Sequence, residues 1–198
     1  MTEARRSRFG FLGGSFDPVH LGHLFAAQDA FEYLALDRVT FVPAAQTPLK
    51  DHAPLASAAQ RVAMLRAALA DDPRFDISEV EIKRGGTSYT IDTARALREQ
   101  HPHDALYWII GADQATRLGS WHNIGELARL IEFIVLARPG FSLPQGGVPD
   151  GVRLHPVSAH VFDVSASEIR ARLGSGKPVE FFLPSGVADL ISQQHLYQ

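Results

Sequence analysis

The chain has 198 residues, with 19 lysines and arginines against 22 aspartates and glutamates, so its formal net charge is −3. Hydrophobic residues make up 45% and charged residues 21%, close to the average of a well-cored globular protein, which excludes disordered, collagen-like and coiled-coil classes. The slight acidity argues against a general nucleic-acid binder, and the absence of cysteine excludes disulfides, cysteine metal sites and thiol nucleophiles.

The first part of the chain predicts a strand, a helix, a strand and a loop. Residues 8–12 form a compact apolar run that stops at Gly13-Gly14, which is typical of a buried strand entering a tight loop. Between residues 21 and 35, apolar side chains recur three, four and seven positions apart, which predicts a helix face. Residues 39–42 predict a second strand, and the three prolines within residues 43–55 predict a loop.

The rest of the chain continues this alternation. Ser57 and Gln60 have the spacing of a capping box, which predicts a helix that runs to about Ala70. Residues 75–82 alternate with one change of phase, which predicts a bulged strand before the Arg84-Gly85-Gly86 turn. The other predicted elements are a helix at 90–100, strands at 106–110 and 133–136, a loop at 140–151, short strands at 152–157 and 161–164, a helix from the Ser165–Glu168 capping pattern and a helix at 185–195.

This order of elements indicates the fold class. Buried strands separated by helices predict a parallel sheet with helices on both faces. We therefore expect an α/β, doubly wound fold in a single domain over residues 1–198, with a small helical subregion at about 165–198. No signal-peptide apolar region follows residues 1–6, and no apolar run approaches the roughly 18 residues of a membrane span. We expect a soluble cytoplasmic protein.

The segment that leaves the first strand carries the strongest chemical signal. It reads Gly13-Gly14-Ser15-Phe16-Asp17-Pro18-Val19-His20-Leu21-Gly22-His23. Its glycines let the backbone approach a ligand closely, and amides at a helix start attract an anion. His20 and His23 are three residues apart, so both rings can point to one side, with Gly22 leaving the space between them open. Two imidazoles beside backbone amides suit a polyphosphate whose charge grows in a transition state.

Other phosphate-binding motifs do not fit this segment. The Gly-x-Gly-x-x-Gly spacing of dinucleotide-binding loops is missing, and no Gly-Lys-Ser/Thr of a Walker loop follows. Taken singly, His20 or His23 is also compatible with an ordinary histidine in a glycine-rich turn. The remaining histidines show no pair with zinc-ligand spacing, so no metal site of the chain's own is expected.

Four further segments point to one family. They are Ser88-Tyr89-Thr90-Ile91-Asp92-Thr93, Gly111-Ala112-Asp113, Trp121 and Val164-Ser165-Ala166-Ser167-Glu168-Ile169-Arg170. Together with the first motif they resemble, in the right order and over nearly the whole chain, the bacterial nicotinate-nucleotide adenylyltransferase branch of the His-x-Gly-His nucleotidyltransferase superfamily. Two positions depart from that pattern, because Ala166 replaces a hydroxyl residue and Leu49 stands where a histidine is more common.

The resemblance implies a Rossmann-like fold and a reaction in NAD biosynthesis. ATP and nicotinate mononucleotide would give nicotinate adenine dinucleotide (deamido-NAD) and pyrophosphate, with Mg²⁺. Because the attacking phosphate and the triphosphate repel each other, catalysis would consist mostly of positioning and charge neutralisation. We expect direct in-line attack on the α-phosphorus without a covalent intermediate. Neither a nucleic-acid nor a membrane partner is expected, and a homo-oligomer is left open.

The resemblance also implies roles for individual residues. The expected catalytic residues are His20, His23, Lys50 and Arg170, with His23 the better candidate for the transition-state charge. The expected ATP-binding residues are Gly13, Gly14, Ser15, Phe16, His20, Gly22, His23, Gly111, Asp113, Ser165, Ser167 and Arg170. The expected substrate-binding residues for the acceptor are Lys50, Tyr89, Thr90 and Trp121. Trp121 would stack on the pyridine ring, and the backbone near Thr90 would contact its carboxylate.

Other interpretations stay open from the residues alone. Trp121 and Tyr89 could be packing residues instead of ligand contacts. Lys50 could be a solvated charge on a loop, and Arg170 could form an ion pair on the surface of its helix. The close rival is a sister transferase that uses nicotinamide mononucleotide, phosphopantetheine or glycerol phosphate, although Trp121 and residues 88–93 argue against the last two. The rival from another class is a non-catalytic nucleotide-binding module, against which the paired histidines, Lys50 and Arg170 argue.

Overall fold

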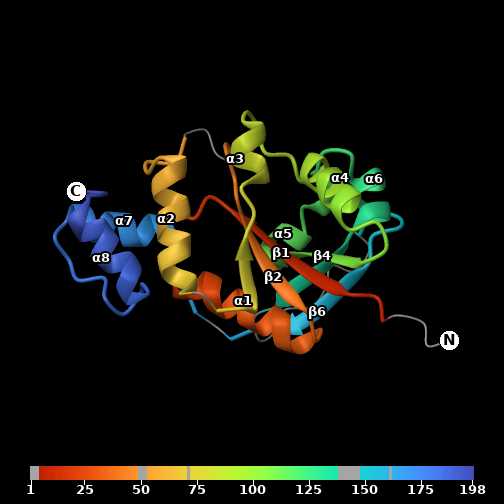
Figure 1. Ribbon diagram of the computed structural model, residues 1–198, viewed down its shortest axis with the longest axis horizontal. Coiled ribbons are helices and arrows are strands. Elements are labelled where there is room, and N and C mark those ends of the chain that lie inside the picture. Colours follow the sequence, from red (N-terminus) through yellow and green to blue (C-terminus); the bar gives the residue numbers. More distant parts are fainter. Residues whose placement is uncertain (1–4, 49–52, 71, 138–147, 161) are drawn as a thin grey trace. The chain divides into compact units, whose positions relative to one another are not determined.

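The computed structural model describes residues 5–48, 53–70, 72–137, 148–160 and 162–198 (Figure 1). Strands and helices alternate along these residues. The elements are β1 (Arg8–Gly14), α1 (Leu21–Tyr33), β2 (Arg38–Pro43), α2 (Ala58–Leu69), β3 (Phe75–Ile77), α3 (Val80–Arg84), α4 (Thr90–Gln100), β4 (Ala105–Gly111), α5 (Ala112–Ala115), the 3₁₀ turn η1 (Leu118–Ser120), α6 (Ile124–Leu130), β5 (Glu132–Ala137), β6 (Leu154–Ser158), α7 (Ala166–Gly174) and α8 (Ser185–Gln193).

The strands of the described residues form one six-stranded sheet in the order β3-β2-β1-β4-β5-β6. The pairs β1–β4, β4–β5 and β5–β6 are parallel, with Phe11 opposite Trp108 and Ile109 opposite Ile134. The strand order reverses between β1 and β4. Ligands of open α/β sheets bind beyond the carboxyl ends of strands at such a reversal, and β1 leads directly into the first motif. The expected α/β, Rossmann-like fold is confirmed.

Packing divides the chain into two compact units. The first unit comprises residues 1–12, 26–40 and 89–161, and the second unit comprises residues 13–25, 41–88 and 162–198. Within the first unit, α4 packs against α6. Within the second unit, α2 and α8 lie side by side (Figure 1). The single domain over residues 1–198 and its subregion at 165–198 stay predictions.

Each unit has its own apolar core. In the first unit, Ile109 of β4 and three successive residues of β5, Phe133 to Val135, are at most 2% exposed. Successive buried residues need cover on both faces of the sheet, which parallel strands receive from their crossover helices. In the second unit, Phe16, Phe41 and residues of α2 are buried.

The predicted capping box at the start of α2 is confirmed. The Gln60 amide donates to Ser57 Oγ at 3.2 Å, and the Ser57 amide donates to Gln60 Oε1 at 2.9 Å. These two bonds satisfy amide donors that the first turn of a helix leaves without backbone partners. The helix ends at Ala70, which takes a left-handed φ of 45°.

The bulged strand predicted over residues 75–82 is wrong in its second half. Only β3 is extended, and Val80–Arg84 forms the short helix α3. The change of phase therefore marks the end of a strand. Gly85 then stops α3, since its amide bonds to the Glu81 carbonyl at 2.9 Å and its φ of 70° is one that glycine adopts readily.

Two further stretches differ from the sequence prediction. Residues 162–164 are not a strand, because the Val164 amide donates to the Phe162 carbonyl at 3.0 Å and bends the chain; Val161 lies outside the described residues. The short elements α5, η1 and α6 were not predicted, since three to seven residues show too little periodicity. Within the described part of the chain, no helix has the length and apolar character needed to cross a membrane.

Candidate active site

The two histidines of the first motif lie together in the second unit. Their ring centroids are 3.8 Å apart and the ring planes are inclined by 33°. The His20 amide donates to His23 Nδ1 at 3.2 Å, and the His23 amide donates to the His20 carbonyl at 2.9 Å. The three-residue spacing at the start of α1 therefore places both imidazoles on one side, as predicted.

His20 is the more buried of the two rings. It is 6% exposed, and its Nδ1 is buried with no hydrogen-bond partner among the described residues. Burial lowers the pKa of His20 from 6.5 to about 4, because a charged imidazolium loses hydration there. The ring is therefore neutral at physiological pH in the ligand-free protein.

Two glycines of the motif are required by the rings beside them. A Cβ on Gly22 would lie 3.1 Å from two atoms of the His20 ring and 3.3 Å from Val164 Cγ1. A Cβ on Gly14 would lie 3.1 Å from the ring of Phe16, which is itself buried and edge-on to His23. The space expected between the histidines at Gly22 is thus occupied by the His20 ring.

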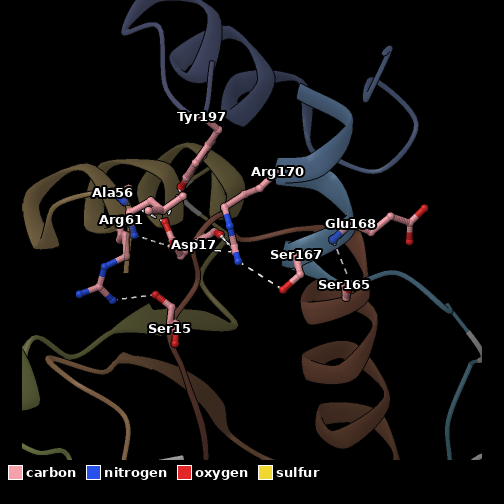
Figure 2. Close-up of polar contacts among 10 residues, drawn as sticks. Ser15, Asp17, Ala56, Arg61, Ser165, Ser167, Glu168, Arg170 and Tyr197 are labelled. Atoms are coloured by element: carbon pink, nitrogen blue, oxygen red, sulfur yellow. Dashed lines mark hydrogen bonds and ion pairs between the residues drawn. The ribbon is translucent and has the colours of Figure 1, made fainter. Parts of the chain in front are cut away.

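Asp17 is the centre of the polar contacts in this unit (Figure 2). Its side chain is buried, and its Oδ2 accepts from the Leu55 amide at 2.8 Å. Its Oδ1 accepts from the Ala56 amide at 3.0 Å and from the Tyr197 hydroxyl at 2.7 Å. Arg170 Nη1 also lies 3.9 Å from Oδ2, so the Asp17 carboxylate has three hydrogen bonds and one ion-pair partner.

Arg170 of α7 is anchored on the first motif. Its Nη1 donates to the Asp17 carbonyl at 2.6 Å, and its Nη2 donates to Ser167 Oγ at 3.2 Å. Ser165 caps α7 by accepting the Glu168 amide at 3.1 Å, while the Glu168 carboxylate points away from that cap (Figure 2). The guanidinium of Arg170 therefore joins residues 164–170 to the first motif, because Arg170 lies 153 residues after Asp17.

Arg61 of α2 supports the first motif from within the core. It is 2% exposed, its Nη1 donates to the Ser15 carbonyl at 2.7 Å, and its Nε has no partner among the described residues. Burial lowers the pKa of Arg61, while the nearby charge of Asp17 partly offsets that effect. A buried cation beside a buried carboxylate stabilises the loop only while both are present.

In the first unit, the expected ATP-binding residues Gly111 and Asp113 lie where β4 turns into α5. Gly111 ends β4, and its amide donates to Gln114 Oε1 at 3.2 Å. A Cβ there would lie 2.8 Å from Asp113 Oδ1, so a larger residue would require the exposed Asp113 side chain to move. Asp113 itself is exposed.

The aromatic residues expected for the acceptor lie in the same unit. Tyr89 is 37% exposed, and its ring centroid is 4.7 Å from that of His122. Trp121 is half-buried and stands edge-on to Phe133 at 5.9 Å. Thr90 is the first residue of α4, whose N-cap residue forms no side-chain capping bond. Lys50 and Leu49 lie outside the described residues.

Comparison with known proteins assigns the family. Residues 11–172 match the family described as Cytidylyltransferase-like. A "Probable nicotinate-nucleotide adenylyltransferase" of Opitutus terrae is 50% identical over 191 residues, covering 96% of this chain and 98% of the relative. A protein of the same description from Herpetosiphon aurantiacus is 42% identical, again covering 96% and 98%. The chain belongs to the nicotinate-nucleotide adenylyltransferase family.

Solved structures share the fold of this nicotinate-nucleotide adenylyltransferase family member. The Plasmodium falciparum nicotinic acid mononucleotide adenylyltransferase complexed with NaAD superposes with a TM-score of 0.79 at 20% identity, covering 96% of this chain and 97% of that one. A putative nicotinate-nucleotide adenylyltransferase from Vibrio parahaemolyticus has a TM-score of 0.69 at 17% identity, with 96% and 95% covered. The family and the nucleotidyltransferase class predicted from the sequence are confirmed.

Sequence reasoning missed three residues that form the polar contacts of the first motif in this nicotinate-nucleotide adenylyltransferase family member. Asp17 stood inside the first motif without a role, and Arg61 and Tyr197 were not considered. A signal for Arg61 existed, because an arginine on the apolar face of a predicted helix, beside Val62 and Leu65, must find a partner. Nothing local points to Tyr197.

Proposed function

We propose that this protein transfers the adenylyl group of ATP to nicotinate mononucleotide, with nicotinate adenine dinucleotide and pyrophosphate as products. The observation that carries the proposal is the first motif, in which two imidazoles lie together while the Asp17 carbonyl anchors Arg170. Relatives that are 42 and 50% identical over nearly their whole length, and that are described as probable nicotinate-nucleotide adenylyltransferases, support the choice of acceptor.

The chemical step needs no protein nucleophile. An oxygen of the acceptor's 5′-phosphate attacks the α-phosphorus of ATP, a new P–O bond forms, and the bond from the α-phosphorus to the bridging oxygen of pyrophosphate breaks. Negative charge grows on the oxygens around the α-phosphorus and on the leaving group. Groups that donate to these oxygens only as the charge grows lower the barrier.

We assign those donors to the second unit. His23 stabilises the charge at the α-phosphate, and the buried, neutral His20 binds beside it as a hydrogen-bond donor. Arg170 holds the β- and γ-phosphates, and the Ser167 hydroxyl and the amides at the start of α7 add further donors. Mg²⁺ would arrive with ATP, because Mg²⁺ commonly keeps several waters and binds through substrate phosphates.

We assign the acceptor to residues of the first unit. The amide end of α4 at Thr90 attracts the nicotinate carboxylate, because a helix N-terminus is positive and no side chain caps this one. Trp121 stacks on the pyridine ring, with Tyr89 as a further contact. Asp113 serves a ribose or the adenylate side. Lys50, which belongs to the second unit and lies outside the described residues, keeps its predicted role at the substrate phosphates.

The test compares two acceptors in parallel. Pyrophosphate release from ATP and Mg²⁺ is measured with nicotinate mononucleotide and with nicotinamide mononucleotide. We expect kcat/KM to favour the acid by about tenfold or more, since the amide lacks the charge that α4 attracts. Equal use would refute the carboxylate contact, and no turnover with either would refute the adenylyltransferase proposal in favour of another acceptor or a non-catalytic module.

A further inference from the structure

Tyr197 follows α8 and reaches back to the first motif. Its hydroxyl donates to Asp17 Oδ1 at 2.7 Å, across 180 residues of sequence. Its backbone takes a φ of 64°, a left-handed conformation that non-glycine residues adopt only where surrounding contacts hold them. Burial and the bond to Asp17 raise the pKa of the Tyr197 phenol, so the hydroxyl keeps its proton at neutral pH.

The Asp17 carboxylate also lies near Arg170. The guanidinium bonds to the Asp17 backbone carbonyl, whereas its Nη1 stays 3.9 Å from Oδ2, too far for a direct hydrogen bond. The two carboxylate oxygens are instead occupied by the Leu55 and Ala56 amides and the Tyr197 hydroxyl. Oδ1 already accepts two hydrogen bonds and Oδ2 accepts one, so a bidentate pair with Arg170, which needs a site on each oxygen, is blocked at Oδ1.

We propose that Tyr197 is a positioning residue that keeps Asp17 from forming a bidentate pair with Arg170, and thereby leaves the Arg170 guanidinium available to the phosphates of ATP. A buried carboxylate that loses a donor binds the closest cation more strongly. Without the hydroxyl, the Asp17 carboxylate pairs with Arg170 and competes with the ATP phosphates for the N–H donors of its guanidinium. The inference rests on the proposed function in one respect, namely that Arg170 binds ATP.

The test is Tyr197→Phe, which removes the hydroxyl and keeps the ring. We expect KM for ATP to rise about tenfold, while kcat and KM for nicotinate mononucleotide stay within twofold of the wild type. Tyr33→Phe is the matched control, because Tyr33 is 63% exposed on α1 and should change neither constant. A lower melting temperature with a reduced active fraction and both KM values unchanged would mean a purely structural role and overturn the proposal.

A second variant isolates the carboxylate. Asp17→Asn removes the charge that competes for Arg170, so adding Tyr197→Phe to that background should leave KM for ATP unchanged. A tenfold rise in both backgrounds would overturn the proposal. Absence of wild-type turnover would refute the proposed function instead. The dissociation constant of ATP, measured by calorimetry, should likewise rise on Tyr197→Phe in the wild-type background and stay unchanged in the Asp17→Asn background.

Discussion

In the second unit, Arg170 and the first motif are tied to buried partners, whereas in the first unit Tyr89, Thr90 and Trp121, which are expected to bind the acceptor, lie at exposed or half-buried positions. Arg170 is anchored on Asp17, and Arg61 supports the Ser15 carbonyl from the core. Tyr89, by contrast, is exposed, and Trp121 is half-buried. The proposed phosphate-binding residue Arg170 is thus held in place by protein contacts, whereas the proposed acceptor-binding residues have more freedom to adjust.

The largest expected effect comes from the chemistry of the second unit. His23→Ala should lower kcat by about 10²–10³-fold, because it removes one group that stabilises transition-state charge. The melting temperature should stay within a few degrees, since His23 is only half-buried. Steady-state pyrophosphate release measures the effect, with exposed His103→Ala as control. A loss smaller than tenfold would contradict the role of His23 and weaken the contrast between the units.

A second prediction tests whether the second unit depends on its buried cation. Arg61→Met should lower the free energy of unfolding by about 2–3 kcal/mol, because Asp17 keeps its burial and loses a nearby positive charge. Arg66→Met, on the same helix, should change it by less than about 1 kcal/mol, since its pair with Glu79 is exposed. Urea unfolding of the two variants makes the comparison. Equal changes in the free energy of unfolding would contradict the prediction that the buried Arg61 stabilises the second unit more than the exposed Arg66.

The third prediction concerns pH. The pKa of His20 is lowered to about 4 in the folded state against 6.5 in the unfolded state, so between these values the unfolded chain binds more protons. Stability should therefore fall as pH falls, by about 2 kcal/mol between pH 7 and pH 5 from this group alone. In His20→Gln, the free energy of unfolding should fall less between pH 7 and pH 5, by that amount, and urea unfolding at both pH values measures the difference. An identical fall would contradict the assignment to His20.

The smallest expected effect concerns the acceptor-binding residues proposed in the first unit. Trp121→Ala should raise KM for nicotinate mononucleotide by up to about tenfold, the value of one aromatic contact, and leave KM for ATP unchanged. Phe181→Ala is the control, because Phe181 is 89% exposed in the second unit. Substrate titrations with the other substrate saturating separate the two constants. A rise in KM for ATP alone would reverse the assignment of the two units.

Local patterns predicted most of the fold. The capping box at Ser57 and the apolar strands ending at Gly14 and Gly111 lie where the sequence placed them, because these signals depend on neighbours a few residues apart. The failure at residues 75–82 has the same origin. Two apolar residues on either side of a phase change fit both a bulged strand and a strand followed by a helical turn.

The geometry of the site was predicted in part. His20 and His23 lie together because a three-residue spacing at a helix start brings both side chains to one side, and this is readable from sequence. Asp17 stood in the same motif, but its partners lie 38, 39, 153 and 180 residues away. No periodic pattern encodes such distances.

The sequence by itself determined the alternation of strands and helices, the pairing of the two histidines and the family to which the chain belongs. The tertiary structure alone decided that Asp17 joins Arg170 and Tyr197, and that Trp121 stands against Phe133. The physical reason is that backbone propensity and helix spacing act over a few residues. Buried polar groups, in contrast, take whichever partners the packed core brings to them, because leaving one unpaired costs more than any local preference supplies.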